Sequence, residues 1–281
     1  MDKNNDLSNI EDVSSKNSVK PLNKLEYNSS PLLKIENLCK TFHKNEPDEK
    51  IIFKNLNLTI KKGEFVTIIG GNGAGKSTLM NLISGSMPPD SGKIFIDNKD
   101  VTNLPEYKRA KYIGRVFQDP MKGTAPNLTI EENLSLALLR NSKRNLFFGI
   151  NKQNQSFLKE ELAKLSLGLE NRLKTKVGLL SGGQRQAVTL LMATLIKPKI
   201  LLLDEHTAAL DPKSRDKILE LTKKITDNPE VTTLMITHNI ENALAFGHRT
   251  IMLKLGEFIF DLKGDERKTI NYLELQENFG F

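Results

Sequence analysis

Gly70-Gly71-Asn72-Gly73-Ala74-Gly75-Lys76-Ser77-Thr78 is the stretch that decides the fold of this 281-residue chain. It follows Glu64–Ile69, which reads as a buried strand, and precedes Leu79–Ile83, which reads as helix. In that context the pattern GxxxxGK[ST] predicts a phosphate-binding loop. Glycines let successive N–H groups point inward, and the helix N-terminus adds partial positive charge. Lys76 would reach the β- and γ-phosphates, and the Ser77 hydroxyl would hold Mg²⁺.

The composition limits the compartment and the kind of partner. The net charge of +7, with 27% charged residues, is a mild basic excess that does not by itself indicate nucleic-acid binding. Solvated surface explains it, and contact with anionic lipid or an acidic partner is the alternative. The single cysteine, Cys39, excludes an internal disulfide and favours a reducing compartment. No apolar run approaches the roughly 18 residues of a membrane span, so a membrane role would need another chain.

The chain divides into two tails and one folded region. Residues 1–30 are rich in Asn, Ser, Lys and Asp, and so little apolar surface predicts a disordered N-terminal tail. The folded region covers 31–265, and 266–281 are a short C-terminal helix or tail. Within the folded region, about 119–180 is a helical insertion, because two segments read as amphipathic helices, Ile130–Arg140 and Phe157–Leu167.

A second glycine turn follows that insertion. Leu180-Ser181-Gly182-Gly183-Gln184 opens a helical pattern that runs from Arg185 to Ile196. Two glycines and a serine at a helix start can form an anion-binding nest. An ordinary helix cap is the alternative, but the position after a phosphate loop favours the nest.

Two further buried strands end in polar residues. Lys199–Glu205 is a continuous apolar run that ends in two carboxylates, as expected of a parallel strand buried on both faces. Asp204 is positioned to bind Mg²⁺ and Glu205 to polarise the water that attacks the γ-phosphate. Thr232–Thr237 is the next such strand and ends at His238, which would face the same phosphates. Simple solvation of the carboxylates and a strand-capping histidine are the alternatives.

In this order the motifs resemble those of the ATP-binding subunit of an ABC transporter, over about residues 32–262. The phosphate loop matches the Walker A loop of that family, Gln118 the Q-loop, Leu180–Gln184 the LSGGQ signature, Ile200–Asp204 the Walker B strand with Glu205 after it, Leu210-Asp211 the D-loop, and His238 the switch histidine. The resemblance implies an α/β fold: a P-loop NTPase ABC cassette with a RecA-like core, an antiparallel β subdomain and a helical insertion.

The resemblance also implies ATP and Mg²⁺ as cofactors, ATP hydrolysis coupled to transport, and roles for particular residues. Glu205, His238 and Gln118 would be catalytic, and Ser77, Gln118 and Asp204 would hold the metal. Phe42 falls where the family places an aromatic residue that stacks on adenine, a core position being the alternative. The remaining nucleotide-binding residues would be Gly70, Gly71, Asn72, Gly73, Ala74, Gly75, Lys76, Ser77, Thr78, Ser181, Gly182, Gly183 and Gln184.

The family also implies partners and a location. The phosphate loop and the signature belong to opposite faces of one subunit, so two copies would meet head to tail around ATP. Integral membrane permease subunits and an extracellular substrate-binding lipoprotein would be further partners, and no nucleic acid is expected. The chain would lie at the cytoplasmic face of the cell membrane, attached through the permease.

Two departures narrow the resemblance. Gly71 and His206 stand where many relatives have proline, and with Leu104–Ala110 and Gly114–Pro120 they are similar to bacterial importer ATPases of the tryptophan/tyrosine or amino-acid type. We interpret His206 as a structural substitute for proline rather than an extra catalytic group. An exporter-type ABC ATPase and a soluble ABC ATPase unrelated to transport remain as alternatives.

Overall fold

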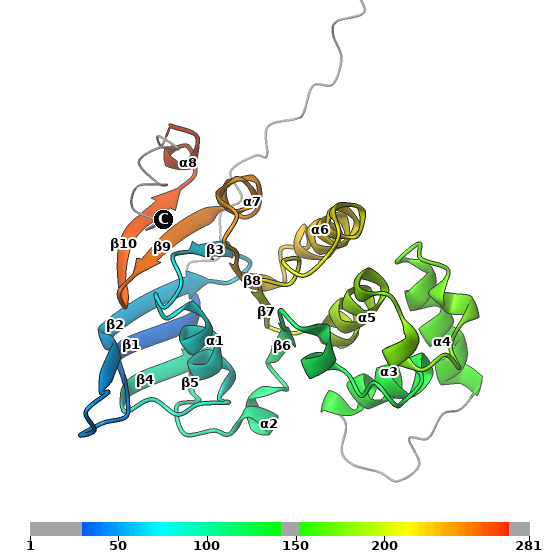
Figure 1. Cartoon of the computed structure of the whole chain (residues 1–281), viewed down its shortest axis with the longest axis horizontal. Helices are drawn as coiled ribbons and strands as arrows, with labels where there is room; N and C mark the ends of the chain where they lie inside the picture. The colour runs from blue at the N-terminus through cyan, green and yellow to red at the C-terminus, as the bar shows by residue number, and fades with distance from the viewer. Residues whose placement is uncertain (1–29, 142–151, 270–281) are drawn as a thin grey trace, which may run out of the picture.

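The structure, a computed structural model, describes residues 30–141 and 152–269, and its strands form two sheets (Figure 1). The first is antiparallel, in the order β2-β1-β4-β5, with β1 Pro31–Phe42, β2 Lys50–Lys61, β4 Ser91–Ile96 and β5 Lys99–Asp100. The second has the order β10-β9-β3-β8-β7-β6, with β3 Phe65–Ile69, β6 Ile113–Val116, β7 Ile200–Asp204, β8 Thr232–Ile236, β9 Arg249–Lys254 and β10 Glu257–Lys263.

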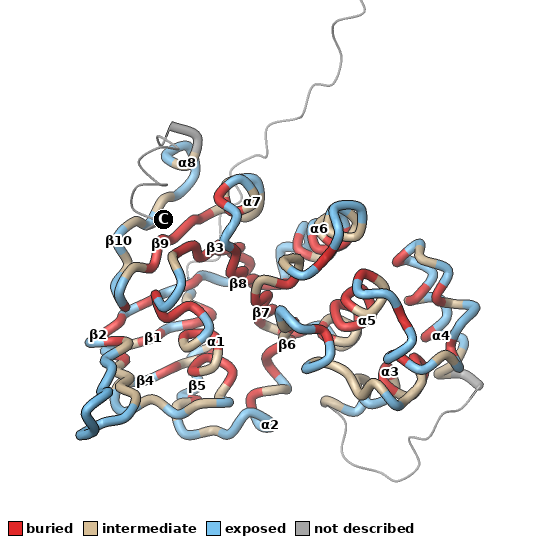
Figure 2. The backbone as a smooth tube through the Cα atoms, viewed as in Figure 1, coloured by how far each residue is buried: buried red, intermediate tan, exposed pale blue. Residues whose placement is uncertain are grey.

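The order of the second sheet differs from the order of its strands in the chain, and this positions the site. β9, β3, β8, β7 and β6 are mutually parallel neighbours, and only β10 runs antiparallel. Every residue of β3, β7 and β8 is buried (Figure 2), which explains their apolar sequences without alternation. The carboxyl ends of neighbouring parallel strands lie at one edge of the sheet, so the residues that follow β3, β8, β7 and β6 are brought together.

One helix packs between the two sheets, and several others pack against the opposite face of the second sheet. The helices are α1 Lys76–Ser84, α2 Glu106–Arg109, α3 Ile130–Leu138, α4 Lys152–Ala163, α5 Gly182–Thr194, α6 Pro212–Thr226, α7 Ile240–Ala245 and α8 Glu266–Thr269, with the short turns η1 Pro120–Gly123, η2 Leu139–Asn141, η3 Leu169–Asn171 and η4 Val177–Leu179. One hydrophobic core is formed by α1 and both sheets. A second is formed by the four helices α3, α4, α5 and α6 and the opposite face of β7 and β8. A third, small core holds α7 against β3 and β9.

In the stretch of about 119–180, where the sequence predicts a helical insertion, the structure has α3 and α4, and their bounds differ from the predicted ones. The first predicted helix begins at Ile130 as expected, because Thr129 and Glu132 form a capping box, and it ends at Leu138 before the turn η2. The second prediction was wrong at both ends, since α4 covers Lys152–Ala163. It ends early because Ser166 and Gly168 adopt left-handed backbone conformations that interrupt the helix.

Some predicted segments fall wholly or largely outside the described residues. The predicted tail 1–30 has only Ser30 inside them, and of 266–281 only α8 is described. The predicted boundaries of the tails therefore stay predictions.

Candidate functional site

The glycine-rich loop lies between β3 and α1, and the lysine at its end donates hydrogen bonds back to two carbonyl oxygens of the loop. Lys76 Nζ donates to the carbonyl oxygens of Gly70 at 2.6 Å and Gly71 at 3.0 Å. Gly75 has φ +104°, and a Cβ there would lie 2.9 Å from the Phe53 ring, so the loop requires glycine at this position. Ala74, Gly75 and Lys76 are buried, whereas Asn72, Gly73 and Ser77 are exposed and Gly71 and Thr78 are half-buried.

Three side chains that follow different strands along the chain converge on the carboxylate of Glu205. Gln118 Nε2 donates to Glu205 Oε2 at 3.2 Å, His238 Nδ1 lies 3.5 Å from the same oxygen, and Lys76 Nζ lies 4.0 Å from Oε1. Glu205 adopts φ +44°, and its N–H donates to the carbonyl oxygen of Ile236 at 3.0 Å. These four residues lie far apart in the sequence, and the strand order β3-β8-β7-β6 brings them together.

Asp204 sits at the last position of β7, buried beside two cations. Burial raises the pKa of its carboxyl, while Arg115 and Lys76 oppose that effect. Arg115 Nη2 lies 3.5 Å from Asp204 Oδ2 and donates to Asn81 Oδ1 at 2.8 Å. Burial also lowers the pKa of Lys76, against the attraction of Glu205 and Asp204. Lys76 and the two carboxylates thus form a compact cluster of opposite charges.

Sequence reasoning missed Arg115. Its guanidinium also donates to Ser84 Oγ at 3.0 Å and packs on the Phe117 ring, with the Cζ atom 4.5 Å from the ring centroid. It therefore ties α1 to β7 and to the segment that leads into Gln118. The signal was present in the sequence, since an arginine interrupts an otherwise buried strand, β6.

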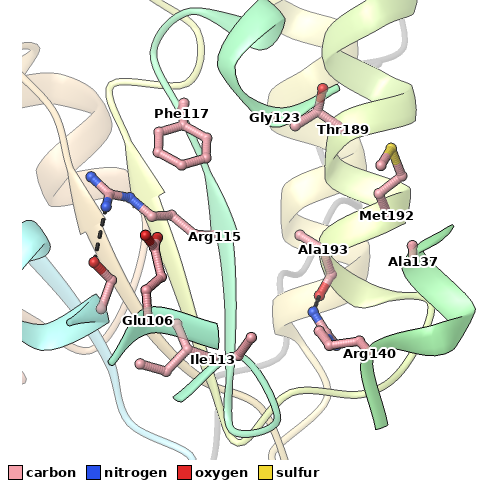
Figure 3. A pocket seen from close by; sticks show the side chains of 12 residues that line it. Glu106, Ile113, Arg115, Phe117, Gly123, Ala137, Arg140, Thr189, Met192 and Ala193 are labelled. Carbon is pink, nitrogen blue, oxygen red and sulfur yellow. Dashed lines mark hydrogen bonds between the residues drawn. The ribbon is translucent and has the colours of Figure 1, made fainter. Parts of the chain in front are cut away.

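Arg115 also lines a cavity of about 210 Å³ between the strand-rich part and the helices (Figure 3). Its walls come from the end of α1, α2, β6, η1, the end of α3 with η2, and α5. The side chains in Figure 3 include Glu106, Phe117, Arg140 and Met192, so the lining is apolar with charged groups of both signs.

Phe42 is the last residue of β1 and does not belong to the hydrophobic core. It is half-buried and pairs with Lys50, whose Nζ is 3.9 Å from where a Cβ on Gly73 would stand. The amine of Lys40 lies 5.8 Å from the ring centroid. This position beside the phosphate loop is compatible with adenine stacking and argues against the alternative of a core phenylalanine.

The signature residues form the start of α5. Ser181 Oγ accepts from the Gln184 N–H at 3.3 Å, and the Ser181 N–H donates back to Gln184 Oε1 at 3.3 Å. Gly183 packs on α6, because a Cβ there would lie 2.5 Å from Ser214 Oγ, and Gly182 faces Leu210. Among the described residues, these contacts join the signature to α6 and not to the phosphate loop. Figure 1 shows α1 and α5 in different parts of the molecule.

His206 is buried under α6 and does not face the carboxylate cluster. Its Nε2 lies 2.9 Å from Thr222 Oγ1, and burial lowers its pKa to about 4. A neutral, hydrogen-bonded histidine in a core agrees with the structural role predicted for it.

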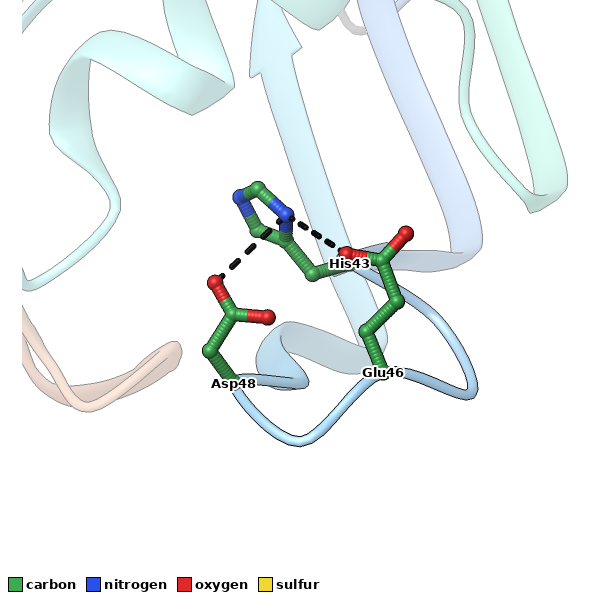
Figure 4. A group of neighbouring side chains, drawn as sticks. All are labelled: His43, Glu46 and Asp48. Atoms are coloured by element: carbon green, nitrogen blue, oxygen red, sulfur yellow. Dashed lines mark hydrogen bonds and ion pairs between the residues drawn. The ribbon is translucent and has the colours of Figure 1, made fainter.

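A separate cluster occupies the loop between β1 and β2 (Figure 4). His43 Nδ1 lies 3.3 Å from Glu46 Oε2 and 3.6 Å from Asp48 Oδ2. All three side chains are more than half exposed, so water competes for any cation there. We assign no metal to this cluster.

Comparison with known proteins decides the family. Residues 53–208 match the ABC transporter family, which is more than half of the chain. The chain belongs to the ABC transporter family. It is therefore an ABC ATPase, an ATP-binding cassette of the P-loop NTPase fold whose family members hydrolyse ATP.

The relatives of this ABC ATPase cover most of its length. It is 48% identical over 250 residues to a tyrosine transport ATP-binding protein of Clostridioides difficile, covering 89% of this chain and 99% of the relative. It is 36% identical to a spermidine/putrescine import ATP-binding protein of Spiroplasma citri, covering 80% of this chain and 59% of the relative.

A solved structure shows the same fold. It is a dimeric, post-hydrolysis ATP-binding cassette from Methanocaldococcus jannaschii bound to ADP and Pi, with 35% identity, a TM-score of 0.71 and coverage of 82% of this chain and 98% of the other. In residues 30–141 and 152–269 of our chain, no helix is both long and apolar enough to cross a bilayer.

Proposed function

We propose that this ABC ATPase supplies the energy for a membrane permease that imports an amino acid or a similar small solute. The observation that carries the catalytic part is the convergence of Lys76, Gln118 and His238 on Glu205. The name of the relative that transports tyrosine supports the amino-acid class. The spermidine/putrescine relative supports only the wider class of small solutes, so we leave the individual substrate open.

The residues present fit a nucleotide with Mg²⁺. The loop needs glycine at position 75, where a Cβ would lie 2.9 Å from the Phe53 ring. Within the described residues, the buried Lys76 amine donates to the carbonyl oxygens of Gly70 and Gly71 and lies 4.0 Å from Glu205. Phosphate oxygens are stronger partners for that amine, so Lys76 would turn to them. The Ser77 hydroxyl and the Asp204 carboxylate are oxygen ligands of the kind that Mg²⁺ takes, with Gln118 beside them. When bound, Mg²⁺ would neutralise the charge that develops on the phosphates.

Glu205 would act as the general base. Its backbone is fixed by the hydrogen bond to Ile236, at the end of a strand buried on both faces. Its carboxylate faces the loop that would hold the γ-phosphate, so it can accept the proton of the attacking water. Gln118 and His238 share Oε2 and would orient the carboxylate and contact the γ-phosphate.

The signature is part of the same reaction only if a second copy is present. In one chain it packs on α6, away from the phosphate loop. We propose a head-to-tail dimer in which Ser181 and Gly183 of one copy complete the phosphate shell of the other. The dimeric state of the similar cassette supports this arrangement. ATP would stabilise the closed pair because it binds that state more tightly.

The permease would contact the helical side of the cavity in Figure 3, along Asp119–Ile130 and the start of α3. Large apolar side chains are exposed around this region, including Tyr107, Met121 and Leu136. Gln118 directly precedes Asp119, so movement of this segment would reach Glu205 through one hydrogen bond. The cassette would lie peripherally on the cytoplasmic side of the membrane.

Affinity purification of a tagged Glu205→Gln chain from native membranes with ATP tests the transport assignment. Removing the base should trap the ATP-bound dimer, and an integral membrane permease with an amino-acid-binding lipoprotein should co-purify. A matched Glu205→Gln, Lys76→Ala chain, which should bind ATP poorly because it lacks the loop lysine, is the control. Co-purification with ribosomes or nucleic acid, or with no membrane protein, would refute transport while leaving the ATPase identity intact.

Lys122→Glu tests the coupling surface. Lys122 is exposed on η1, and Lys54, exposed on β2, is the matched control. We expect Lys122→Glu to abolish transport with solution ATPase activity unchanged, and Lys54→Glu to change neither. Loss of both activities in the Lys122 variant would contradict a coupling role.

A further inference from the structure

Arg109 binds the C-terminal end of the helix that follows the phosphate loop. It belongs to α2, is 1% exposed, and donates through Nη1 to the carbonyl oxygens of Leu82 at 2.7 Å and Ile83 at 2.9 Å, in the last turn of α1. Its Nε and Nη2 donate to two further carbonyls, those of Leu104 and Thr102, both at 2.8 Å. A cation beside unpaired C-terminal carbonyls also opposes the negative end of the helix dipole.

Arg140 binds the end of the signature helix in the same way. It belongs to the turn η2, and its Nη1 donates to the carbonyl oxygen of Ala193 at 3.0 Å, in the last turn of α5. Its Nη2 donates to the carbonyl oxygen of Ile196, two residues beyond that helix. Two donors of one rigid guanidinium therefore close the C-terminal end of α5.

Arg267 binds the end of the helix that follows His238. It belongs to α8, and its Nη2 donates to the carbonyl oxygens of Ala243 at 2.9 Å, Leu244 at 2.8 Å and Phe246 at 2.6 Å. Its Nη1 donates to the carbonyl oxygen of Gly247. The C-terminal end of α7 is thus held from α8 at the far end of the chain.

The opposite ends of these three helices carry the nucleotide motifs. α1 begins at Lys76, α5 is capped by Ser181, and α7 is capped by Asn239, which directly follows His238. The helices are only six to thirteen residues long, so a tilt fixed at one end sets the position of the other.

We propose that Arg109, Arg140 and Arg267 are positioning residues, each of which holds the C-terminal end of a helix so that the motif residue at or just before its opposite end is oriented toward the nucleotide. The part that concerns Arg140 rests on the proposed dimer. The planar guanidinium group of arginine can donate hydrogen bonds to several carbonyl oxygens at once, whereas lysine keeps the positive charge but not this arrangement of donors.

The test is to replace each arginine by lysine and to look for a different defect in each variant. Arg109→Lys should weaken ATP binding to the single chain roughly tenfold, because a misplaced first turn of α1 would lose one charge-assisted hydrogen bond to the phosphates. In the Glu205→Gln background, Arg140→Lys should leave ATP binding to the single chain unchanged and weaken ATP-dependent dimerisation by a similar factor. Arg267→Lys should lower turnover alone, and should have no further effect in a His238→Ala chain.

Arg249→Lys is the matched control. Arg249 is also largely buried, with 10% of its side chain exposed, but its guanidinium donates to the carboxylate of Asp261 on the neighbouring strand β10, at 2.5 and 2.7 Å. It should lower the melting temperature without changing binding, dimerisation or turnover. ATP binding is measured with a fluorescent ATP analogue, and dimerisation by analytical ultracentrifugation.

The outcomes separate positioning from simple stabilisation. If the three variants all lose the same activities, in proportion to the fall in their melting temperatures, the proposal is overturned. If the Glu205→Gln parent does not dimerise with ATP, the proposed dimer fails, and the role of Arg140 with it. The readouts for Arg109 and Arg267 decide their roles in either case.

Discussion

His206 should make this ABC ATPase lose stability in mild acid. The imidazole is buried between β7 and α6, hydrogen-bonded to Thr222, and burial lowers its pKa from 6.5 to about 4. The folded-state pKa is below the unfolded-state value, so the unfolded chain takes up a proton first as the pH falls. The contribution of neutral His206 to stability is therefore complete above pH 6.5 and is lost progressively down to about pH 4.

The size of the effect follows from the shift. Each unit of pKa corresponds to about 1.4 kcal/mol, so the full loss is about 3 kcal/mol, of which about 2 kcal/mol is lost between pH 7.5 and pH 5. For a protein of this size that corresponds to a fall in melting temperature of about 4–8 °C. His206→Gln keeps a hydrogen-bonding side chain toward Thr222 but cannot titrate, so it should lack this part of the pH dependence.

Equilibrium unfolding in urea at pH 7.5 and pH 5, without nucleotide, measures the difference. The wild-type chain should lose about 2 kcal/mol more than His206→Gln between the two pH values. Other titrating groups, such as the half-buried His248, are present in both chains and cancel in the comparison. An equal loss in wild type and His206→Gln would refute the reasoning.

Three further predictions concern the nucleotide site. Phe42→Ala should weaken ATP binding about tenfold, because it removes a surface on which adenine can stack. The melting temperature should not change, since the ring lies outside the core, and wild-type affinity in a nucleotide titration would contradict the stacking role. Gly75→Ala should abolish ATP binding, because a Cβ at this position would lie 2.9 Å from the Phe53 ring and because the φ of Gly75 is +104°. Retained binding in the same titration would contradict the requirement for glycine in the loop. Gln118→Ala should lower kcat about tenfold with little change in KM, because the Gln118 amide donates a hydrogen bond to Glu205. Steady-state kinetics in which KM rises and kcat is unchanged would exclude a role of Gln118 in the chemical step.

Local features of the sequence were enough for the pieces of the site. The glycine pattern predicted the loop, and the unbroken apolar runs predicted buried parallel strands that end at Asp204 and near His238. The serine before two glycines predicted the start of α5, although its first helical residue is Gly182 and not Arg185. The hydrophobic pattern did not predict the bounds of α4. The helix ends at Ala163 because Ser166 and Gly168 adopt left-handed backbone conformations, and the spacing of apolar residues does not reveal such conformations.

Backbone preference, capping and hydrophobic period act over a few residues, and for that reason the sequence by itself determined the loop, the buried strands and the motif residues of this protein. The meeting of Lys76, Gln118 and His238 at Glu205 depends on the strand order β3-β8-β7-β6, which is set by packing of the whole sheet. Arg115 and the three arginines at helix ends acquire their partners only through that packing, because their carbonyl and carboxylate acceptors lie on other elements. Only the tertiary structure therefore decided which residues hold the site in place.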